Sequence, residues 1–207
     1  MPPIVLNNQL ASSTHGIAQQ SAGKQSDDVR ELPSIGMLLG EGSQKCVFYS
    51  LEHGDRCVAL IKKDGIGNLS PAETAQKEVN YIKHLESVGL PTVKTYGVVK
   101  CGDQYGVERG LILNPFDSQD IILGRVDLPS NPTILNHIIR QLENIANILD
   151  ERQIDIDDLQ FLIDGDTGDV FISDPREVSL GNPQKCIDKT KELRGRVREI
   201  LLDFECE

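Results

Sequence analysis

The chain has 207 residues, of which 39% are hydrophobic and 26% charged, and its formal net charge at pH 7 is −11. These values are typical of a globular protein with one good core or two small lobes. The longest apolar run, around 58–61, is far shorter than the ~20 residues that a membrane span requires. The basic residues are scattered, which argues against a nucleic-acid partner because phosphate contacts need clustered lysine and arginine.

The cysteine pattern gives no sign of a disulfide framework or a zinc site. The five cysteines form no C-x-x-C pair and are odd in number; they stand at positions 46, 57, 101, 186 and 206. This pattern indicates a protein that works in a reducing compartment.

Residues 1–30 are rich in serine, glutamine, asparagine and alanine and show no sustained hydrophobic period. A segment of this kind lacks the apolar surface that would offset the entropy of ordering, so we predict a disordered polar leader. It has neither the basic start nor the apolar stretch of a general-secretory signal, although it could serve a different secretion machine.

The next segment predicts a hairpin followed by a helix. Two β-rich runs within 35–61 flank the turn-forming pair Gly54-Asp55. Ser70 and Glu73 then form a capping box around a proline, and apolar residues recur at helical spacing until Gly89, a plausible C-terminal cap. We therefore expect one well-marked amphipathic helix after the hairpin.

The remaining chain alternates strand-like and helical patterns. In order, we predict strands at 92–99 and 107–113, a proline-bearing connector at 114–120, a helix opening at Pro132, a tight hairpin within 161–174 and a closing helix at 187–204. Two lobes, 31–113 and 121–207, would be joined at the connector and leave a cleft between them.

The first candidate site is the pair Gly40 and Gly42, closed by Val47. With Lys62, 22 residues beyond Gly40, and Glu78 in the capped helix, it resembles the N-lobe of the protein kinase family. That family has a glycine-rich loop, a strand lysine and a helix glutamate in this order; Lys45 replaces its third glycine here. The resemblance implies that Lys62, held by Glu78, positions the phosphates of ATP.

The same resemblance assigns the connector to the kinase hinge. Leu113 falls where the family's gatekeeper lies, Asn114 and Phe116 where adenine is received, and Asp120 where an acidic residue often meets the ribose. The proline between Asn114 and Phe116 removes one backbone donor.

The second lobe contains an aspartate-rich stretch that resembles the kinase catalytic loop. Gln160, followed by an apolar run, takes the place of a metal-binding asparagine, and Asp155 lies five residues before it as the orienting base. Asp157 and Asp158 are competing candidates for the base. Asp174 stands where the family has the aspartate of Asp-Phe-Gly, so the resemblance implies that Asp174 and Gln160 hold Mg²⁺.

A calcium-binding loop is the main rival explanation of this acidic stretch. An EF-hand register would require an acidic or amide residue at 168, glycine at 169 and glutamate at 175, whereas the chain has Gly168, Asp169 and Pro175. The calcium interpretation therefore fails, and Asp164, Asp166 and Asp169 are expected to form an acidic surface turn.

Only 33 residues follow Asp174, and they contain no Ala-Pro-Glu segment. We therefore predict an α+β, protein-kinase-like bilobal fold, with a β-rich N-lobe containing one helix and a reduced, mainly helical C-lobe. The short form, the polar leader and the segment GEGSQKCVFYS are similar to the minimal effector kinases of the Hop group, which type III secretion delivers into eukaryotic cells.

This second resemblance implies an ATP- and Mg²⁺-dependent serine/threonine kinase acting in the host cytosol, expected to be monomeric. Its substrate would be the host's ninety-kilodalton heat-shock chaperone, which would bind the kinase as it binds a client and be inactivated by phosphorylation. Two alternatives stay open. The chain could be an inert pseudokinase-type module that binds a host chaperone, or a kinase for a small molecule.

Overall fold

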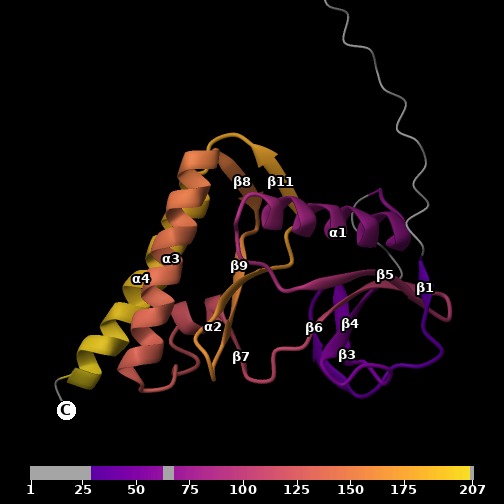
Figure 1. Ribbon diagram of the computed structural model, residues 1–207, viewed down its shortest axis with the longest axis horizontal. Helices are drawn as coiled ribbons and strands as arrows, with labels where there is room; N and C mark the ends of the chain where they lie inside the picture. Colours follow the sequence, from indigo (N-terminus) through magenta and orange to yellow (C-terminus); the bar gives the residue numbers. More distant parts are fainter. Residues whose placement is uncertain (1–28, 63–67, 206–207) are drawn as a thin grey trace, which may run out of the picture.

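The computed structural model describes residues 29–62 and 68–205. Most of the predicted leader, 1–28, lies outside these residues; its last residue, Arg30, opens the first strand. The described chain is an α+β fold of two lobes placed side by side (Figure 1). The N-terminal lobe comprises β1 to β6 and α1, and the C-terminal lobe comprises β7 to α4.

The N-terminal lobe is built on a six-stranded sheet with the order β1-β5-β6-β4-β3-β2. Only the β1–β5 pair is parallel. The strands are β1 (Arg30–Glu31), β2 (Leu38–Glu41), β3 (Lys45–Tyr49), β4 (Arg56–Ile61), β5 (Thr95–Cys101) and β6 (Gln104–Gly110). Because β6 is central, its side chains face packed elements on both sides of the sheet.

The predicted hairpin around Gly54-Asp55 is confirmed by the antiparallel pairing of β3 with β4. The next two strands are displaced from their predicted bounds by about three residues, because the chain turns at Gly102 and Asp103 between β5 and β6. Gly102 has φ 57°, in the left-handed region that glycine adopts without penalty. The displacement matters because it moves the end of β6, where the cleft begins.

Helix α1 (Pro71–Ser87) confirms the predicted capped helix and lies across one face of this sheet (Figure 1). The Ser70 hydroxyl accepts from the Glu73 amide, the Glu73 carboxylate accepts from the Ser70 amide, and Gly89 follows the helix at φ 88°. The buried residues between helix and sheet are Ile61, Ala75, Val79, Val98 and Val107. This packing sets the rotation of α1 and so directs Glu78 toward the cleft.

The C-terminal lobe combines two long helices with two small sheets. Its elements are β7 (Pro115–Asp117), α2 (Ser118–Ile122), α3 (Pro132–Arg152), β8 (Ile154–Asp157), β9 (Gln160–Asp164), β10 (Val170–Ser173), β11 (Glu177–Leu180) and α4 (Gln184–Glu205). The predicted hairpin and both long helices are confirmed. The segment 114–120, predicted as a connector, instead contains β7, which pairs with β9, and the start of α2.

Helices α3 and α4 pack side by side over the small sheets and enclose the main core (Figure 1). The segment after α1 ties the two lobes together, because the Ile172 amide of β10 donates to the Pro91 carbonyl at 2.8 Å. In the β9–β10 hairpin Gln160 pairs with Ser173, so Asp174 leaves the sheet beside Gln160. Among the described residues, no helix is long and apolar enough to span a membrane.

Candidate functional site

Two adjoining cavities lie between the lobes. The polar cavity, of about 370 Å³, is lined by Gly42, Lys45, Arg109, Asp158, Gln160 and Asp174 among others. The apolar cavity, of about 280 Å³, is lined by residues that include Gly40, Cys57, Val93, Leu111, Ile112 and Pro115. Val47, Ala59, Arg109 and Leu162 line both, so the cavities form one continuous cleft. Its two halves suit a ligand with one apolar end and one highly charged end.

The predicted glycine pair covers this cleft. Gly40, near the end of β2, lines the apolar cavity, and Gly42, in the turn between β2 and β3, lines the polar one. Neither glycine has a positive φ, and a Cβ on either would meet no atom closer than 3.8 Å. The fold itself therefore does not demand glycine here, and the missing side chains leave room for a ligand under the hairpin.

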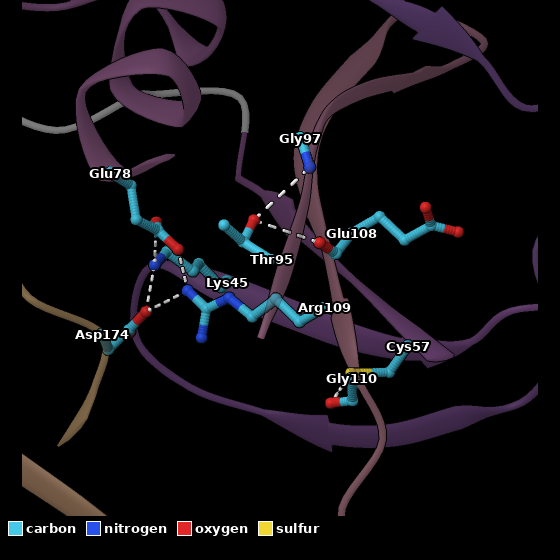
Figure 2. A network of polar contacts seen from close by, with 9 residues as sticks. All are labelled: Lys45, Cys57, Glu78, Thr95, Gly97, Glu108, Arg109, Gly110 and Asp174. Atoms are coloured by element: carbon cyan, nitrogen blue, oxygen red, sulfur yellow. Dashed lines mark hydrogen bonds and ion pairs between the residues drawn. The ribbon is translucent and has the colours of Figure 1, made fainter. Parts of the chain in front are cut away.

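Lys45, Glu78 and Asp174 meet at the edge of the polar cavity from three separate elements (Figure 2), and Lys45 and Asp174 line the cavity itself. Lys45 lies on β3, Glu78 on α1 and Asp174 directly after β10. The Lys45 Nζ donates to Glu78 Oε2 at 2.5 Å and forms an ion pair with Asp174 Oδ1. The side chains of Lys45 and Glu78 are only 10% and 5% exposed, so this pairing is shielded from solvent.

The predicted pair of Lys62 with Glu78 is wrong. Lys62 follows the last residue of β4, and its Nζ contacts Glu41 Oε1 at 2.6 Å, with both side chains more than a third exposed. Such a surface pair contributes little to stability. Lys45, which stands in the position of the family's third glycine, is the lysine that meets Glu78. The missed signal was alternation along β3, because Lys45 and Val47 are two residues apart and both line the cleft.

A fourth charged residue, Arg109 on β6, was not anticipated from the sequence. Its Nη2 contacts both Glu78 Oε1 and Asp174 Oδ1, the second at 2.8 Å. The four side chains form a closed ring in which each carboxylate faces both cations, and Figure 2 shows all four contacts. We call Lys45, Glu78, Arg109 and Asp174 the charge ring.

The charge ring shifts the acidity of its members. Burial and, after it, the charge of Arg109 lower the pKa of Lys45 to about 8, although the Asp174 carboxylate acts in the opposite direction. For Asp174, burial would raise the pKa, but the charges and hydrogen bonds of Arg109 and Lys45 outweigh it and hold the pKa well below its usual range. Asp174 is therefore ionised at neutral pH, whereas Lys45 loses its proton around pH 8.

The backbone aims Asp174 at the ring. Its φ is 55°, in the left-handed region, which aspartate tolerates better than most residues. The residue after it is Pro175, which cannot continue the ladder of β10. The strand therefore ends at Ser173, and the Asp174 carboxylate lines the cleft.

The predicted base, Asp155, does not reach this cavity. It lies on β8, where the Cys186 thiol of α4 is 3.5 Å from its Oδ1. Of its two competitors, Asp157 lines an adjoining cavity of about 250 Å³ next to α1, which shares Lys45 and Asp174 with the polar cavity, and Asp158 lines the polar cavity itself. The Gln160 Nε2 donates to Asp158 Oδ2 at 3.1 Å. The structure thus brings Asp158, rather than Asp155, together with Gln160 and Asp174.

The predicted hinge residues also lie elsewhere. Leu113 is 76% exposed, and with Asn114 and Phe116 it lines an open cavity outside the cleft. Asp120 lies in α2 and pairs with Arg125 at 3.3 Å. The connecting segment in the cleft consists of Gly110, Leu111 and Ile112, because β6 ends three residues earlier than predicted. None of the four predicted residues therefore meets the cleft.

A magnesium ion is compatible with the oxygen atoms at the polar cavity. Both ring cations contact Oδ1 of Asp174, and within the described chain no hydrogen bond is made to its Oδ2. Asp158 and Gln160 add further oxygens on the same wall. The described residues contain no cluster of three or more acidic, histidine or cysteine ligands. Mg²⁺ needs none, since it is commonly held by one or two carboxylates together with substrate phosphates.

Comparison with known proteins identifies a family and a relative that this chain is similar to. The family described as "Type III secretion system effector HopBF1 kinase domain" matches residues 7–200. A type III effector protein HopBF1 of Pseudomonas syringae pv. syringae (strain FF5) is 38% identical over 176 residues, which cover 85% of this chain and 87% of that protein.

Among solved structures, the chain is similar to one in the CAK complex of Chaetomium thermophilum bound to ATP-gamma-S, with a TM-score of 0.49 and 19% identity. The match covers 70% of this chain and 47% of the other. The two-lobed fold, the charge ring in its cleft and the extent of the sequence match agree with one assignment: the chain belongs to the HopBF1 kinase family of type III secretion system effectors.

Proposed function

We propose that this kinase transfers the γ-phosphoryl group of ATP to a serine or threonine of a host protein. The observation that carries the proposal is that Lys45, paired with Glu78, meets Asp174 in a polar cavity that continues into an apolar one. Phosphoryl transfer needs little covalent chemistry from the protein, so it depends on positioning and charge of this kind.

The two cavities divide the nucleotide between them. The adenine would lie in the apolar cavity, between Val47 and Ala59 on one side and Leu162 on the other. Its polar edge would face the backbone of Leu111 and Ile112. The phosphates would lie under Gly42 and beside Lys45, whose charge Glu78 holds in place. Asp174 and Gln160 would hold Mg²⁺, which would neutralise charge on the phosphates.

Asp158 is the base that this geometry favours. The acceptor hydroxyl forms a bond to the γ-phosphorus as the bond to the bridging oxygen breaks, and its proton passes to a carboxylate. Asp158 lines the polar cavity together with Asp174, whereas Asp155 does not. The side chain of Arg176, 3.7 Å from Asp158, adds a positive charge at the same wall.

For the acceptor we propose the host's ninety-kilodalton heat-shock chaperone, reached in the host cytosol after type III secretion. The support is the resemblance to the Hop-group effector kinases and the description of the relatives as type III effectors. The described part of the C-terminal lobe consists of two long helices, one short helix and small sheets, which leaves little protein with which to build a peptide-docking platform. A partner that contributes much of the recognition surface fits this reduced form.

The acceptor is tested by mass spectrometry of the purified chaperone after incubation with Mg-ATP and the kinase. We expect one added phosphate on a serine or threonine with the wild type and none with Asp174→Ala. An unmodified chaperone would instead support the binding-module alternative, provided that the two proteins still associate. ATP consumption that requires a metabolite and no protein would support the small-molecule alternative.

Substitution of the two lysines separates the structural assignment from the sequence-based one. Lys45→Ala removes the cation in the ring and should lower kcat/KM for ATP by about 10²- to 10³-fold. Lys62→Ala removes only a surface ion pair and should stay within about threefold of wild type. Circular dichroism and thermal unfolding serve as folding controls, and the reverse order of effects would reject Lys45.

Two isosteric substitutions test the base. Asp158→Asn keeps size and hydrogen bonding but cannot take a proton, so kcat should fall by roughly 10²- to 10⁴-fold while ATP affinity changes little. Asp155→Asn, on the neighbouring strand, is the matched control and should leave kcat near the wild-type value. A large loss in Asp155→Asn with an active Asp158→Asn would favour the base predicted from the sequence.

ATP affinity should depend on pH through Lys45. Its pKa of about 8 means that the ammonium is mostly charged below this pH and mostly neutral above it. The charged form attracts phosphates, so the affinity should fall as pH rises through 8, approaching about tenfold per pH unit for one coupled proton. Calorimetric titration from pH 7 to 9.5 measures this.

Lys45→Arg provides the control for this pH dependence, because arginine stays charged throughout the range. Its ATP affinity, even if weaker overall, should be nearly flat between pH 7 and 9.5. Equal declines in both proteins would show that another group is responsible.

A further inference from the structure

Strand β6 places two consecutive buried charges on opposite faces of the sheet. Glu108 is 1% exposed and faces Arg30 and Arg56, with Nη2 of Arg30 2.5 Å from its Oε2. Arg109 is 8% exposed and faces α1 and the cleft. Figure 2 shows the Glu108 carboxylate directed away from the charge ring. Both charges have partners of opposite sign, but only Arg109 reaches the functional site.

Arg109 links the same two carboxylates that Lys45 links. Its Nη2 contacts Glu78 Oε1 and Asp174 Oδ1, whereas Lys45 uses Glu78 Oε2 and the same Asp174 oxygen. Glu78 therefore has one cation on each oxygen, and Asp174 has two on a single oxygen. The position of Asp174 relative to α1 thus depends on two parallel links of different chemistry.

The guanidinium also stands at the junction of the two cavities, because Arg109 lines both. Its Nε is buried and has no hydrogen-bond partner in the described part of the chain. Burying an unpaired donor is unfavourable, so this residue is not explained by stability alone. A neutral apolar side chain would fill the place at lower cost if the site did not use the charge.

We propose that Arg109 is a positioning residue that holds Glu78 and Asp174 in register and competes with the divalent cation for Asp174. The inference rests on the proposed function and deepens it. The ring contains two positive and two negative charges, so it is neutral before any ligand enters. Loss of Arg109 leaves the ring with one net negative charge and Asp174 with one link fewer.

These two consequences affect two measurable quantities: the affinity for a divalent ion should rise, and the rate of phosphate transfer should fall. The added negative charge should tighten divalent-ion binding at Asp174 by about tenfold. The lost link should let Asp174 move, and misplacement of a catalytic group by about 1 Å can lower the rate ~10²-fold. General damage to the fold would weaken ion binding and lower the rate together. Tighter ion binding combined with a lower rate therefore distinguishes the proposed role from such damage.

The test compares Arg109→Met, which removes the charge, with Arg109→Lys, which keeps it but replaces the planar guanidinium, whose Nη2 contacts both carboxylates, with a flexible ammonium. Glu108→Gln is the matched control, since it removes a buried charge from the next residue of the same strand, on the face away from the cleft. Thermal unfolding should show that both strand positions affect stability, and only Arg109 should affect the site.

Mn²⁺ alone is the probe for the ion, measured by loss of the free-ion EPR signal in nucleotide-free protein. Arg109→Met should bind Mn²⁺ about tenfold more tightly than wild type, and the gain should vanish in the Arg109→Met/Asp174→Asn double variant. Glu108→Gln should match the wild type. The double variant separates the site from the many acidic groups on the surface of this chain.

Phosphate transfer is measured on the same proteins with the chaperone as acceptor. We expect kcat of Arg109→Met to fall ~10²-fold, with Arg109→Lys intermediate in kcat and unchanged in Mn²⁺ affinity. Unchanged or weaker Mn²⁺ binding in folded Arg109→Met would overturn the proposal. If Arg109→Met does not fold, a wild-type kcat in Arg109→Lys would overturn it.

Failure of the proposed function has a different signature. A wild-type protein that transfers no phosphate would reject the kinase assignment, while the Mn²⁺ comparison would still show whether Arg109 competes at Asp174.

Discussion

A ring of four charges determines how the parts of this protein fit together. Lys45, Glu78, Arg109 and Asp174 come from β3, α1, β6 and the segment after β10, so the ring joins the sheet, the helix of the N-terminal lobe and the C-terminal lobe. Without their partners, Lys45, Glu78 and Arg109 would each be an uncompensated buried charge, which is strongly unfavourable. The two lobes are therefore held in one relative arrangement by the same side chains that would handle phosphate.

The C-terminal lobe that supports the site is small, and its small size explains why one hairpin carries two of the site residues. The C-terminal lobe has two long helices, and their packed core supports the short β9–β10 hairpin. That hairpin delivers both Gln160 and Asp174 to one wall of the cleft, because Gln160 pairs with Ser173. A hairpin needs few residues to bring two ligands together, which suits a lobe with so small a framework.

The acidic residues of the C-terminal lobe fall into two groups with different surroundings. Asp174 is kept ionised by two cations, whereas Asp164, Asp166 and Asp169 lie at the tip of the β9–β10 hairpin. Their hydrogen-bond partners, which include Asn114, Thr167 and His137, carry no fixed positive charge. The tip thus behaves as the acidic turn expected from its sequence. Net charge alone did not reveal this difference between the two groups, because the difference depends on which carboxylates face cations in the fold.

Local patterns of the sequence determined most of the secondary structure and the order of the elements. The capping box at Ser70, the turn at Gly54-Asp55 and the apolar stripe of α3 each depend on residues close together in the chain, so each could be predicted. The glycine pair and Asp174 were likewise recognised by their spacing along the chain. Spacing of this kind was sufficient to indicate a kinase-like protein.

Only the tertiary structure decided which charged residues meet. Lys45 lies 33 residues from Glu78 and 129 from Asp174, and Arg109 lies 65 from Asp174. At such separations partners are chosen by strand register and helix packing. Because β6 ends three residues earlier than predicted, Leu113 and Asn114 lie outside the cleft, whereas Arg109 lies inside it. Lys62 and Asp155 had plausible spacing but face the wrong surroundings, because spacing records distance along the chain and not direction in space.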